Sequence, residues 1–505
     1  TAHTGGFYIK LLNLHHYHCM FGLKGPNMEI ASLKLQNHPI LHDLELNFCD
    51  ENGKPYKNIV FAGENGTGKT ALLNLLHNIT GQMHNFLLTR PSFDFEIKCI
   101  LTSKEFDLVK SFLGEPRVSI VRNLDNKTFV LRYKHTEDDS YNNHVVYLSG
   151  EKHPYPATMN RVSSVFHSIH SKVGMNFETQ AIRSITASQI DSLEELGLRH
   201  TNKDIAMLVK QLLIDISVQD NQYLSDWVDM HDDCVPPKEV KHVKLSRFTD
   251  AFNKMFQSIN FHGIVADGNQ QQVMFIKNGK QIKLEELSSG EKQIVFRGGF
   301  LLKNMGVLDG SIVLIDEPEI SMHPRWQCKI FSFYSDLFKA ETEQKSQIFF
   351  ATHSEYVLKD AMDKKAQIIV LTEQENAVKA EYVNNKFVLP FGPTYAEIKY
   401  FAFNIPTIEF HDELYGYIQE KNGREKENEM EEFLKTNGVK QEKPWSRLKD
   451  GVFKSVQKLT LMTYIRNFYH HPEASRNERN LLHPLEPSDE EMRQSIDCMI
   501  NILQG

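Results

Sequence analysis

The stretch of sequence that decides the fold of this chain is NIVFAGENGTGKT, residues 58–70. Its first four residues are an apolar run that predicts a buried strand, and the leucines and the isoleucine between residues 72 and 79 recur at helical spacing. Between them lies a match to the pattern G-x-x-x-x-G-K-[ST], which consists of Gly63, Glu64, Asn65, Gly66, Thr67, Gly68, Lys69 and Thr70. The order strand, glycine loop, helix predicts a loop whose backbone N–H groups surround phosphates at the positive end of a helix.

Two side chains of this loop carry the expected chemistry. The ammonium group of Lys69 would reach the β- and γ-phosphates, and the hydroxyl of Thr70 would be offered to Mg²⁺. Mg²⁺ accepts few protein ligands and shares the rest of its shell with phosphate and water. The sequence therefore predicts ATP and Mg²⁺ as ligands, and a glycine-rich turn without function is the weaker alternative.

A second motif follows an apolar run at residues 311–315, where Asp316 and Glu317 come directly after the run. This run and a second one at residues 347–351 are typical of strands buried on both faces of a parallel sheet. Open α/β sheets bind their ligands at the carboxyl ends of such strands. We expect Asp316 to hold the magnesium shell and Glu317 to polarise the attacking water as general base.

A third motif, LSSGEKQ at residues 287–293, precedes a helical pattern over residues 294–305 and predicts a second anion site at a helix N-terminus, or else an ordinary N-cap. It resembles the signature of ABC-type ATPases, and His353 in the sequence ATHS is similar to their switch histidine. The family's signature residues match Ser288, Ser289, Gly290 and Glu291. The resemblance implies that Ser288 and Gly290 of one subunit contact the γ-phosphate held by Lys69 of the other. Two nucleotides would then lie in a head-to-tail dimer, and hydrolysis would require dimerisation.

The stretch EPEISMHPRWQ, residues 317–327, resembles the soluble RecF, SMC and OLD branch of this family. No glutamine can be assigned to the family's Q-loop, although Gln180 and Gln189 are candidates. Three later segments resemble PtuA-like ATPases of Septu and retron-associated anti-phage systems, namely residues 393–400, 410–416 and 465–473. This resemblance implies an HNH nuclease of the PtuB type as partner, which the chain would hold in check or present to its substrate. A retron reverse transcriptase with its DNA–RNA hybrid is a further implied partner.

The resemblance implies an α/β fold of the ABC-ATPase head type. Such a head has an antiparallel β subdomain, a mainly parallel sheet that carries the phosphate loop, and a helical subdomain. We expect an N-terminal extension over residues 1–27 and an ATPase domain over residues 28–400, with a helical insertion at about 155–265. A shift to charged, helical composition predicts a helical partner-binding region over residues 401–505.

Composition excludes several classes of protein. The chain has 505 residues, of which 41% are apolar and 24% charged, and its net charge of −8 argues against a uniformly basic surface for nucleic acid. None of the six cysteines forms a C-x-x-C pair, which favours a reducing cytoplasm. No apolar run is long enough for a membrane span, and no signal peptide is apparent. We expect a cytoplasmic homodimer or a higher even oligomer without a membrane partner.

Arg466 and His471 raise a second hypothesis. Their spacing matches the Arg-x-x-x-x-His pattern of HEPN-type ribonucleases, in which the pair would polarise a phosphodiester attacked by a 2′-hydroxyl. Such a spacing also arises by chance in a histidine-rich chain, and both residues could instead cap a helix or contact a partner. A Toprim-type nuclease is excluded because no apolar strand ending in Asp-x-Asp follows residue 360. A further alternative is a scaffold that binds ATP without hydrolysing it.

Four basic residues recur at about three-residue spacing ahead of an apolar helical pattern, and they are Lys238, Lys241, Lys244 and Arg247. They could contact phosphates of nucleic acid, for instance those of the retron hybrid. A charged face that keeps the helix hydrated is the commoner case.

Overall fold

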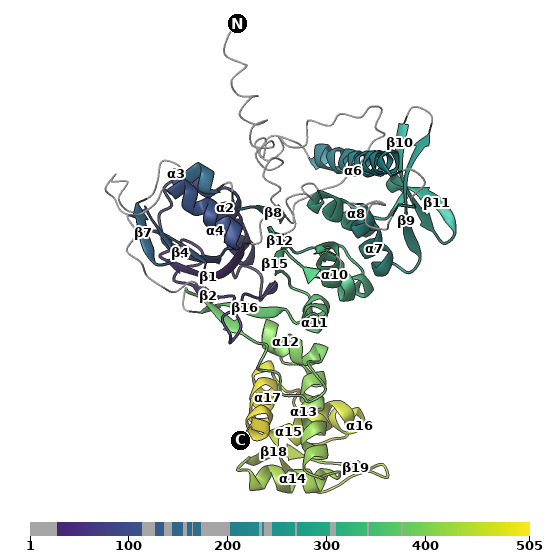
Figure 1. Cartoon of the computed structure of the whole chain (residues 1–505). Helices are drawn as coiled ribbons and strands as arrows, with labels where there is room; N and C mark the ends of the chain where they lie inside the picture. The colour runs from purple at the N-terminus through teal and green to yellow at the C-terminus, as the bar shows by residue number, and fades with distance from the viewer. Residues whose placement is uncertain are drawn as a thin grey trace. The chain divides into compact units, whose positions relative to one another are not determined.

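The computed structural model describes residues 28–113, 127–135, 144–154, 159–163, 165–172, 202–231, 235–236, 245–267, 270–302, 310–340, 343–374 and 377–504. Several predictions therefore concern residues outside this part: the extension over residues 1–27, Gln180, Gln189, Lys238, Lys241 and Lys244. The chain forms two compact units, one up to Glu381 and one from Tyr382 (Figure 1).

The boundary expected near residue 400 lies inside helix α12 (Tyr395–Phe403), so it was placed too late. The physical reason is that α12 packs within the second unit. The ring of Tyr400 lies 5.3 Å from that of Phe410 on α13 (Ile408–Lys421). The composition shift marks the charged surface of the second unit and not its first helix.

The centre of the first unit is a six-stranded sheet with the order β17-β16-β3-β15-β12-β8. The five strands from β16 to β8 pair in parallel. The strands are β3 (Asn58–Ala62), β8 (Ser168–Ser171), β12 (Ile312–Asp316), β15 (Gln347–Ala351), β16 (Gln367–Gln374) and β17 (Ala377–Tyr382). Every residue of β3, β12 and β15 is buried, which confirms the strands predicted from the three apolar runs. Their carboxyl ends share one edge of the sheet.

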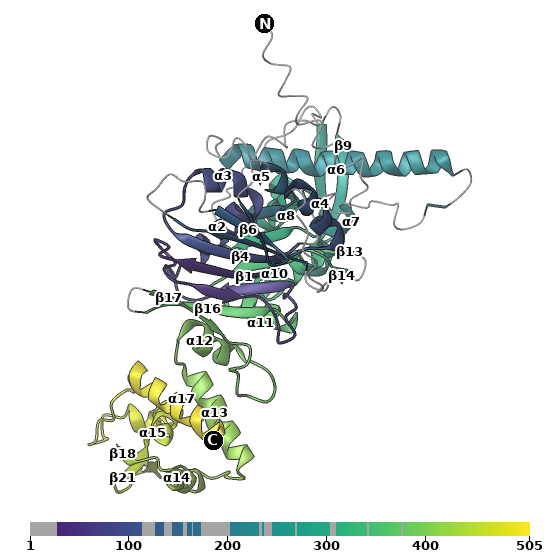
Figure 2. The same cartoon turned by 60° about the vertical axis from the view of Figure 1, so that its left-hand side comes forward.

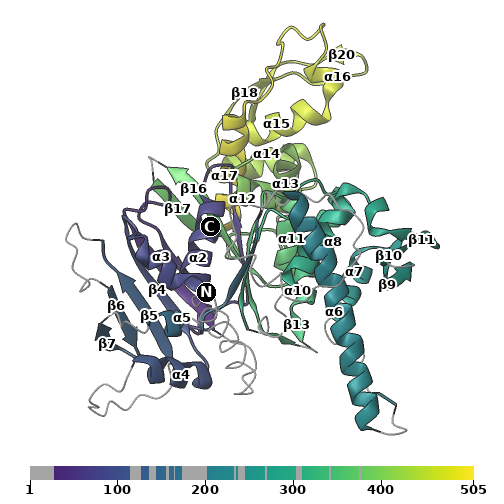
Figure 3. The ribbon, with the colours of Figure 1, turned by 90° about the horizontal axis from the view of Figure 1, so that it is seen from above.

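A second six-stranded sheet, β2-β1-β4-β5-β6-β7, is antiparallel throughout. Its strands are β1 (Glu29–Gln36), β2 (Glu45–Asn47), β4 (Asp94–Ile100), β5 (Thr128–Tyr133), β6 (His144–Leu148) and β7 (Glu151–Pro154). One hydrophobic core joins Leu33 and Ile97 of this sheet with Leu72 and with Phe349 of the central sheet. Figure 3 shows α2 (Lys69–Gly81), α3 (Met83–Leu88) and α5 (Met159–Ser163) on the inner side of the antiparallel sheet.

The helical subdomain contains α6 (Asn202–Met230), α7 (Leu245–Met255), which carries Arg247, and α8 (Ser289–Leu301). The long α6 is drawn side-on in Figure 2. A three-stranded antiparallel sheet accompanies these helices: β9 (Ile259–Asp267), β10 (Gln270–Lys277) and β11 (Lys280–Lys283). The expectation of a mostly helical insertion over 155–265 was therefore wrong in part. Strand β8 belongs to the central sheet, and its sequence SIHS has too few apolar residues to show strand periodicity.

Shorter elements complete the first unit: α4 (Ser103–Leu113), η2 (Leu284–Glu286), α10 (Pro324–Leu337), β13 (Lys339–Ala340), β14 (Glu343–Gln344) and α11 (Glu355–Asp363). Figure 1 shows α10 and α11 beside the green strands of the central sheet. Among the described residues, none of the helices has the length and apolar character that crossing a bilayer requires.

The second unit is mainly helical and has its own hydrophobic core. Besides α12 and α13 it contains α14 (Glu427–Thr436), α15 (Leu461–His470), α16 (Pro472–Ser475) and α17 (Asp489–Gln504). The sequence did not predict its two small antiparallel sheets, formed by β18 (Gln441–Trp445) with β21 (Gln457–Thr460) and by β19 (Leu448–Lys449) with β20 (Val452–Phe453). These strands are short and mostly polar, so they lack an apolar pattern.

Candidate nucleotide-binding site

The phosphate loop connects β3 to α2 and depends on its glycines. Gly63 and Gly68 have φ angles of +133° and +89°. A Cβ atom on Gly63 would lie 2.2 Å from the carbonyl oxygen of Leu371, and one on Gly68 would lie 2.6 Å from Leu41 Cδ2. Only glycine fits both positions without rearrangement. No side chain caps the N-terminus of α2, so its first N–H groups face the loop and suit an anion.

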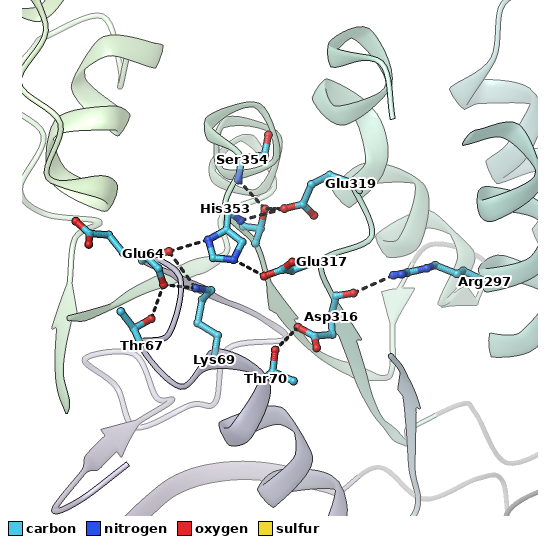
Figure 4. A network of polar contacts seen from close by, with 12 residues as sticks. Glu64, Thr67, Lys69, Thr70, Arg297, Asp316, Glu317, Glu319, His353 and Ser354 are labelled. Carbon is cyan, nitrogen blue, oxygen red and sulfur yellow. Dashed lines mark hydrogen bonds and ion pairs between the residues drawn. The ribbon is translucent and has the colours of Figure 1, made fainter. Parts of the chain in front are cut away.

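Lys69 lies inside this loop and is only 4% exposed. Its Nζ donates hydrogen bonds to the carbonyl oxygens of Gly63 and Glu64, at 3.0 and 2.8 Å (Figure 4). Burial lowers the pKa of Lys69 to about 8, against the opposing effect of nearby carboxylates, of which Glu317 acts most strongly. The hydrogen bonds of Lys69 Nζ go to neutral carbonyls, so a phosphate would add a charged acceptor to this ammonium group.

Thr70 and Asp316 meet as predicted, although they are 246 residues apart. The hydroxyl of Thr70 donates to Asp316 Oδ1 at 3.2 Å. Asp316 is 1% exposed, and burial raises its pKa. Its second oxygen, Oδ2, is buried and has no hydrogen-bond partner within the part of the chain that the structure describes. A hydroxyl beside a carboxylate with a spare oxygen fits the small protein share of a Mg²⁺ shell.

Glu317 lies next to His353, which comes from the end of the neighbouring strand β15. His353 Nε2 contacts Glu317 Oε1, and His353 Nδ1 lies 3.0 Å from the carbonyl oxygen of Gly63. The hydrogen bond from His353 lowers the pKa of Glu317, although burial opposes it. Glu317 is therefore a carboxylate near neutral pH, as a general base must be. The structure thus brings Lys69, Thr70, Asp316, Glu317 and His353 to one edge of the sheet (Figure 4).

Sequence reasoning missed two buried charged residues at this edge. Glu319 Oε1 accepts hydrogen bonds from the Thr352 hydroxyl and from the backbone N–H of His353, the latter at 3.0 Å. Arg297 Nη1 donates to the backbone carbonyl of Asp316 at 2.9 Å. One feature could have indicated Arg297, because it is the only charged residue in the stretch IVFRGGFL, residues 294–301.

The signature residues form the N-terminus of α8. Ser288 is the N-cap: its hydroxyl accepts from the N–H of Glu291, and its own N–H donates to Glu291 Oε2 at 2.8 Å. A Cβ atom on Gly290 would lie 3.0 Å from the Trp326 ring, so a side chain there would crowd α10. Ser288 and Ser289 are exposed, and within the described residues neither is hydrogen-bonded to the phosphate loop of its own chain. Their contact with a nucleotide stays a prediction.

The C-terminal candidates Arg466 and His471 contact different partners. The guanidinium of Arg466 lies 5.4 Å from the ring centre of Tyr415, and His471 Nδ1 lies 3.0 Å from Glu473 Oε1. A second histidine–carboxylate pair in this region involves His470. Its Nε2 lies 2.6 Å from Asp412 Oδ2. The sequence did not predict this pair, because Asp412 is 58 residues earlier on α13.

Asn467 sits beside Arg466 on α15 and is fully buried. Neither its Oδ1 nor its Nδ2 has a hydrogen-bond partner among the residues that the structure describes. Such a group is costly to bury and calls for a physical explanation.

Comparison with known proteins agrees with these motifs. A family model described as "AAA domain, putative AbiEii toxin, Type IV TA system" matches residues 249–359. The Retron Vc95 probable ATPase of Vibrio cholerae serotype O1 biovar El Tor is 31% identical over 103 residues, which are 19% of this chain and 19% of that protein. The Septu protein PtuA of Bacillus thuringiensis is 27% identical over 196 residues, 36% of this chain and 46% of the relative. PtuA of Bacillus mycoides (strain KBAB4) is 28% identical over 28% of this chain and 21% of the relative.

The chain thus spans less than half the length of these curated relatives. Among solved structures, an Smc head bound to the C-winged helix domain of ScpA covers 71% of this chain and 98% of its own, with 12% identity and a TM-score of 0.41. The matches to the family model and to the Septu and retron relatives confirm, at modest sequence identity, the resemblance to the PtuA-like ATPases of these systems.

Proposed function

We propose that this chain binds and hydrolyses ATP as a subunit of an anti-phage defence complex of the Septu or retron type. The observation that carries the ATPase part is the meeting of Lys69, Thr70, Asp316 and Glu317 at one sheet edge, with Glu317 ionised beside His353. The named relatives support the defence part.

The residues suggest a mechanism for hydrolysis. The loop N–H groups and Lys69 would bind the phosphates, while Thr70 and Asp316 would hold Mg²⁺, which neutralises phosphate charge when bound. A water oxygen attacks the γ-phosphorus as the bond to the bridging oxygen of ADP breaks. Glu317 takes the proton that the water loses, and His353 orients Glu317 through their contact. Inorganic phosphate and ADP are the products.

The active form in this proposal is a head-to-tail homodimer or a higher even oligomer. Ser288 and Gly290 of one subunit would complete the site around the γ-phosphate bound to Lys69 of the other. One feature supports this: the N-terminus of α8 exposes Ser288, whose hydroxyl caps the helix. In this arrangement a lone subunit binds ATP but hydrolyses it slowly.

The second unit would serve for partner contact in the cytoplasm. In this proposal the partner is an HNH nuclease of the PtuB type, as the resemblance of the sequence to PtuA-like ATPases implies, and a retron reverse transcriptase with its DNA–RNA hybrid is a further one. The test is ATP turnover of the purified chain with and without Mg²⁺ and with and without the nuclease. Turnover that depends on Mg²⁺ and on protein concentration, together with co-elution of the nuclease, is expected. A chain that binds ATP but never turns it over would instead be a binding scaffold.

A second candidate function is RNA cleavage by the C-terminal unit, with Arg466 and His471 as first proposed from the sequence. The observation that favours it is the Asp412–His470 pair between α13 and α15. Asn467, whose amide has no hydrogen-bond partner among the described residues, lies one helical turn before His470 on α15. A histidine held by a carboxylate beside a cation is suited to proton abstraction from a 2′-hydroxyl next to a phosphodiester.

This candidate is tested by incubating the full chain alone with tRNA, other RNA and DNA. RNA cleavage that is lost in the Arg466→Ala/His471→Ala variant would support it. Cleavage that survives there but is lost in His470→Asn would identify His470 as the base. No cleavage by the wild type, with ATP turnover intact, would assign any nuclease activity to the partner.

A further inference from the structure

The peptide group between Asp316 and Glu317 is held on both sides. Its carbonyl oxygen accepts a hydrogen bond from Arg297 Nη1 at 2.9 Å. Its N–H, on Glu317, donates to the carbonyl oxygen of Ala351 at 3.0 Å. This peptide links the residue that would hold Mg²⁺ to the residue that would act as general base, so its orientation sets the relation between the two carboxylates.

This peptide leads into a strained residue. Glu317 has a φ angle of +40°, in the left-handed region that a non-glycine residue adopts only at an energetic cost. Such a conformation persists only where surrounding contacts over-determine it. The two hydrogen bonds to this peptide supply that constraint, one from each neighbouring element. The conformation directs the Glu317 side chain to His353, while Asp316 reaches Thr70.

Arg297 makes its bond from the helix that carries the signature. It lies on α8, the helix capped by Ser288, and is only 1% exposed. Figure 4 shows its side chain approaching Asp316 from the side opposite Thr70. A buried guanidinium next to two carboxylates also acts through its charge, because it lowers the pKa of both Asp316 and Glu317 against the effect of burial.

We infer that Arg297 is a positioning residue for ATP hydrolysis, which fixes the Asp316–Glu317 peptide and thereby ties both carboxylates to the signature helix. This inference rests on the proposed ATPase function and deepens it. A ligand that presses on the N-terminus of α8 at Ser288 would move Arg297 with the helix. The carboxylates of the chain's own site would then respond to occupancy of the signature, which belongs to the other site of the proposed dimer.

Two substitutions separate the charge of Arg297 from its shape. Arg297→Met keeps an unbranched chain of similar length but removes the charge and the donors. Arg297→Lys keeps the charge but replaces the planar fork with a point charge on a flexible stem. A control is Lys210→Met, which removes another fully buried cation of the same unit, paired with Glu285 at 2.5 Å.

The experiment measures ATP affinity with a fluorescent analogue, kcat and KM for ATP, and the thermal stability of each variant. For Arg297→Met we expect kcat to fall by about 10- to 100-fold while ATP affinity and KM stay within about 3-fold, since misplacement of a reacting group affects the transition state most. Arg297→Lys should recover part of kcat. Lys210→Met should lose thermal stability and keep kcat within about 3-fold of the wild type.

The split between kcat and KM distinguishes positioning from mere stability. A loss of stability lowers the amount of folded enzyme in Arg297→Met and Lys210→Met alike, whereas misplaced carboxylates lower kcat at unchanged ATP affinity only in Arg297→Met. Partial rescue by Arg297→Lys, which can still donate to the carbonyl oxygen of Asp316, is a second sign of positioning.

Two outcomes would overturn the inference, and they are distinguishable. Turnover by the wild type together with an unchanged kcat in Arg297→Met would remove the role of Arg297 and leave the ATPase proposal intact. A wild-type chain that binds ATP without turnover, even at high protein concentration, would remove the proposed function and this inference with it. If Arg297→Met does not fold, Arg297→Lys decides: a kcat equal to that of the wild type would show that the guanidinium fork plays no positioning role.

Discussion

The two units of this chain each bury polar groups, but they bring them together in different ways. In the first unit, Lys69, Asp316 and His353 come from segments about 250 and 40 residues apart and meet at the carboxyl edge of one parallel sheet. In the second unit, Asp412 and His470 meet through the packing of α13 against α15. A parallel sheet gathers strand ends at one edge by construction, whereas two packed helices bring together whichever side chains their mutual rotation selects.

This difference determines how the buried polar atoms without a hydrogen-bond partner among the described residues can be explained in each unit. The free oxygen of Asp316 lies next to Thr70 and a phosphate loop, so a cation shared with phosphate explains it. The amide of Asn467 has no hydrogen-bond partner among the described residues, and no phosphate loop or cation site of this unit explains it. Substitutions in each unit can test whether its unpartnered polar atoms belong to a ligand site.

The largest effect is expected at Glu317. Glu317→Gln should lower ATP turnover by about 10²- to 10⁴-fold, because an amide cannot accept the proton of the attacking water. ATP binding should persist, and the ATP-bound dimer should accumulate in size-exclusion chromatography. Asp363→Asn, which alters an exposed carboxylate of α11, serves as control. Normal turnover in Glu317→Gln would overturn the general-base assignment and leave the first unit without its catalytic residue.

The next effect concerns the backbone of the phosphate loop. Gly63→Ala places a Cβ atom 2.2 Å from Leu371 O, whereas Gly66→Ala meets nothing within 4 Å, although both positions have positive φ. We expect Gly63→Ala to lower the free energy of unfolding by about 3 kcal/mol and to abolish nucleotide binding, and Gly66→Ala to lower it by about 1 kcal/mol. Chemical denaturation and ATP binding check both values. Equal effects would show that backbone conformation, and not the contact with β16, constrains the loop.

Much of the first unit could be predicted because its chemistry follows regular local patterns. The strands β3, β12 and β15 are predominantly apolar. β12 ends in Asp316 of the site, and polar site residues follow β3 and β15 directly. The order of strand, loop and helix then fixed where Lys69 and Thr70 would lie. What could not be predicted is the set of side chains that act across elements, such as Arg297, since its partner is a backbone carbonyl that carries no sequence signal.

The second unit shows the limit of the same reasoning. The hypothesis for Arg466 and His471 rests on their spacing in the sequence, but spacing does not reveal which side chains of another helix face them. The structure pairs His470, the last residue of α15, with Asp412, whereas His471 follows the helix as its C-cap with φ −122° and ψ 62° and contacts Glu473. The sequence does not predict the strands from β18 to β21 for a related reason. They are short and mostly polar, so they lack the hydrophobic pattern that predicts longer strands, and only their pairing in the structure identifies them.

A smaller effect is expected from the pH dependence of stability at Lys69. Its pKa is lowered to about 8 in the folded chain from 10.5. Between these values the unfolded chain binds more protons, so the free energy of unfolding of the ATP-free protein should rise with pH from about 8 to 10.5. Lys69→Met should reduce this rise by about 2 kcal/mol and weaken ATP binding at pH 7 by about 10- to 100-fold. Urea denaturation at pH 7, 8.5 and 10 measures it, and an identical slope in both proteins would contradict the buried state of the ammonium group.

The smallest effect is expected at Asn467, which is buried without a hydrogen-bond partner in the described part of the chain. Replacing such a group by an apolar one of similar size removes a desolvation penalty, so Asn467→Leu should raise the stability of the second unit by about 1 kcal/mol. Hydrogen exchange of α15 in the full chain measures it, and Asn467→Asp, which buries a carboxylate at the same place, should instead accelerate exchange. A loss of stability in Asn467→Leu would mean that the amide has partners in solution, and the contrast with Asp316 would then disappear. A gain in stability with loss of RNA cleavage would show that Asn467 is kept for function, as Asp316 is.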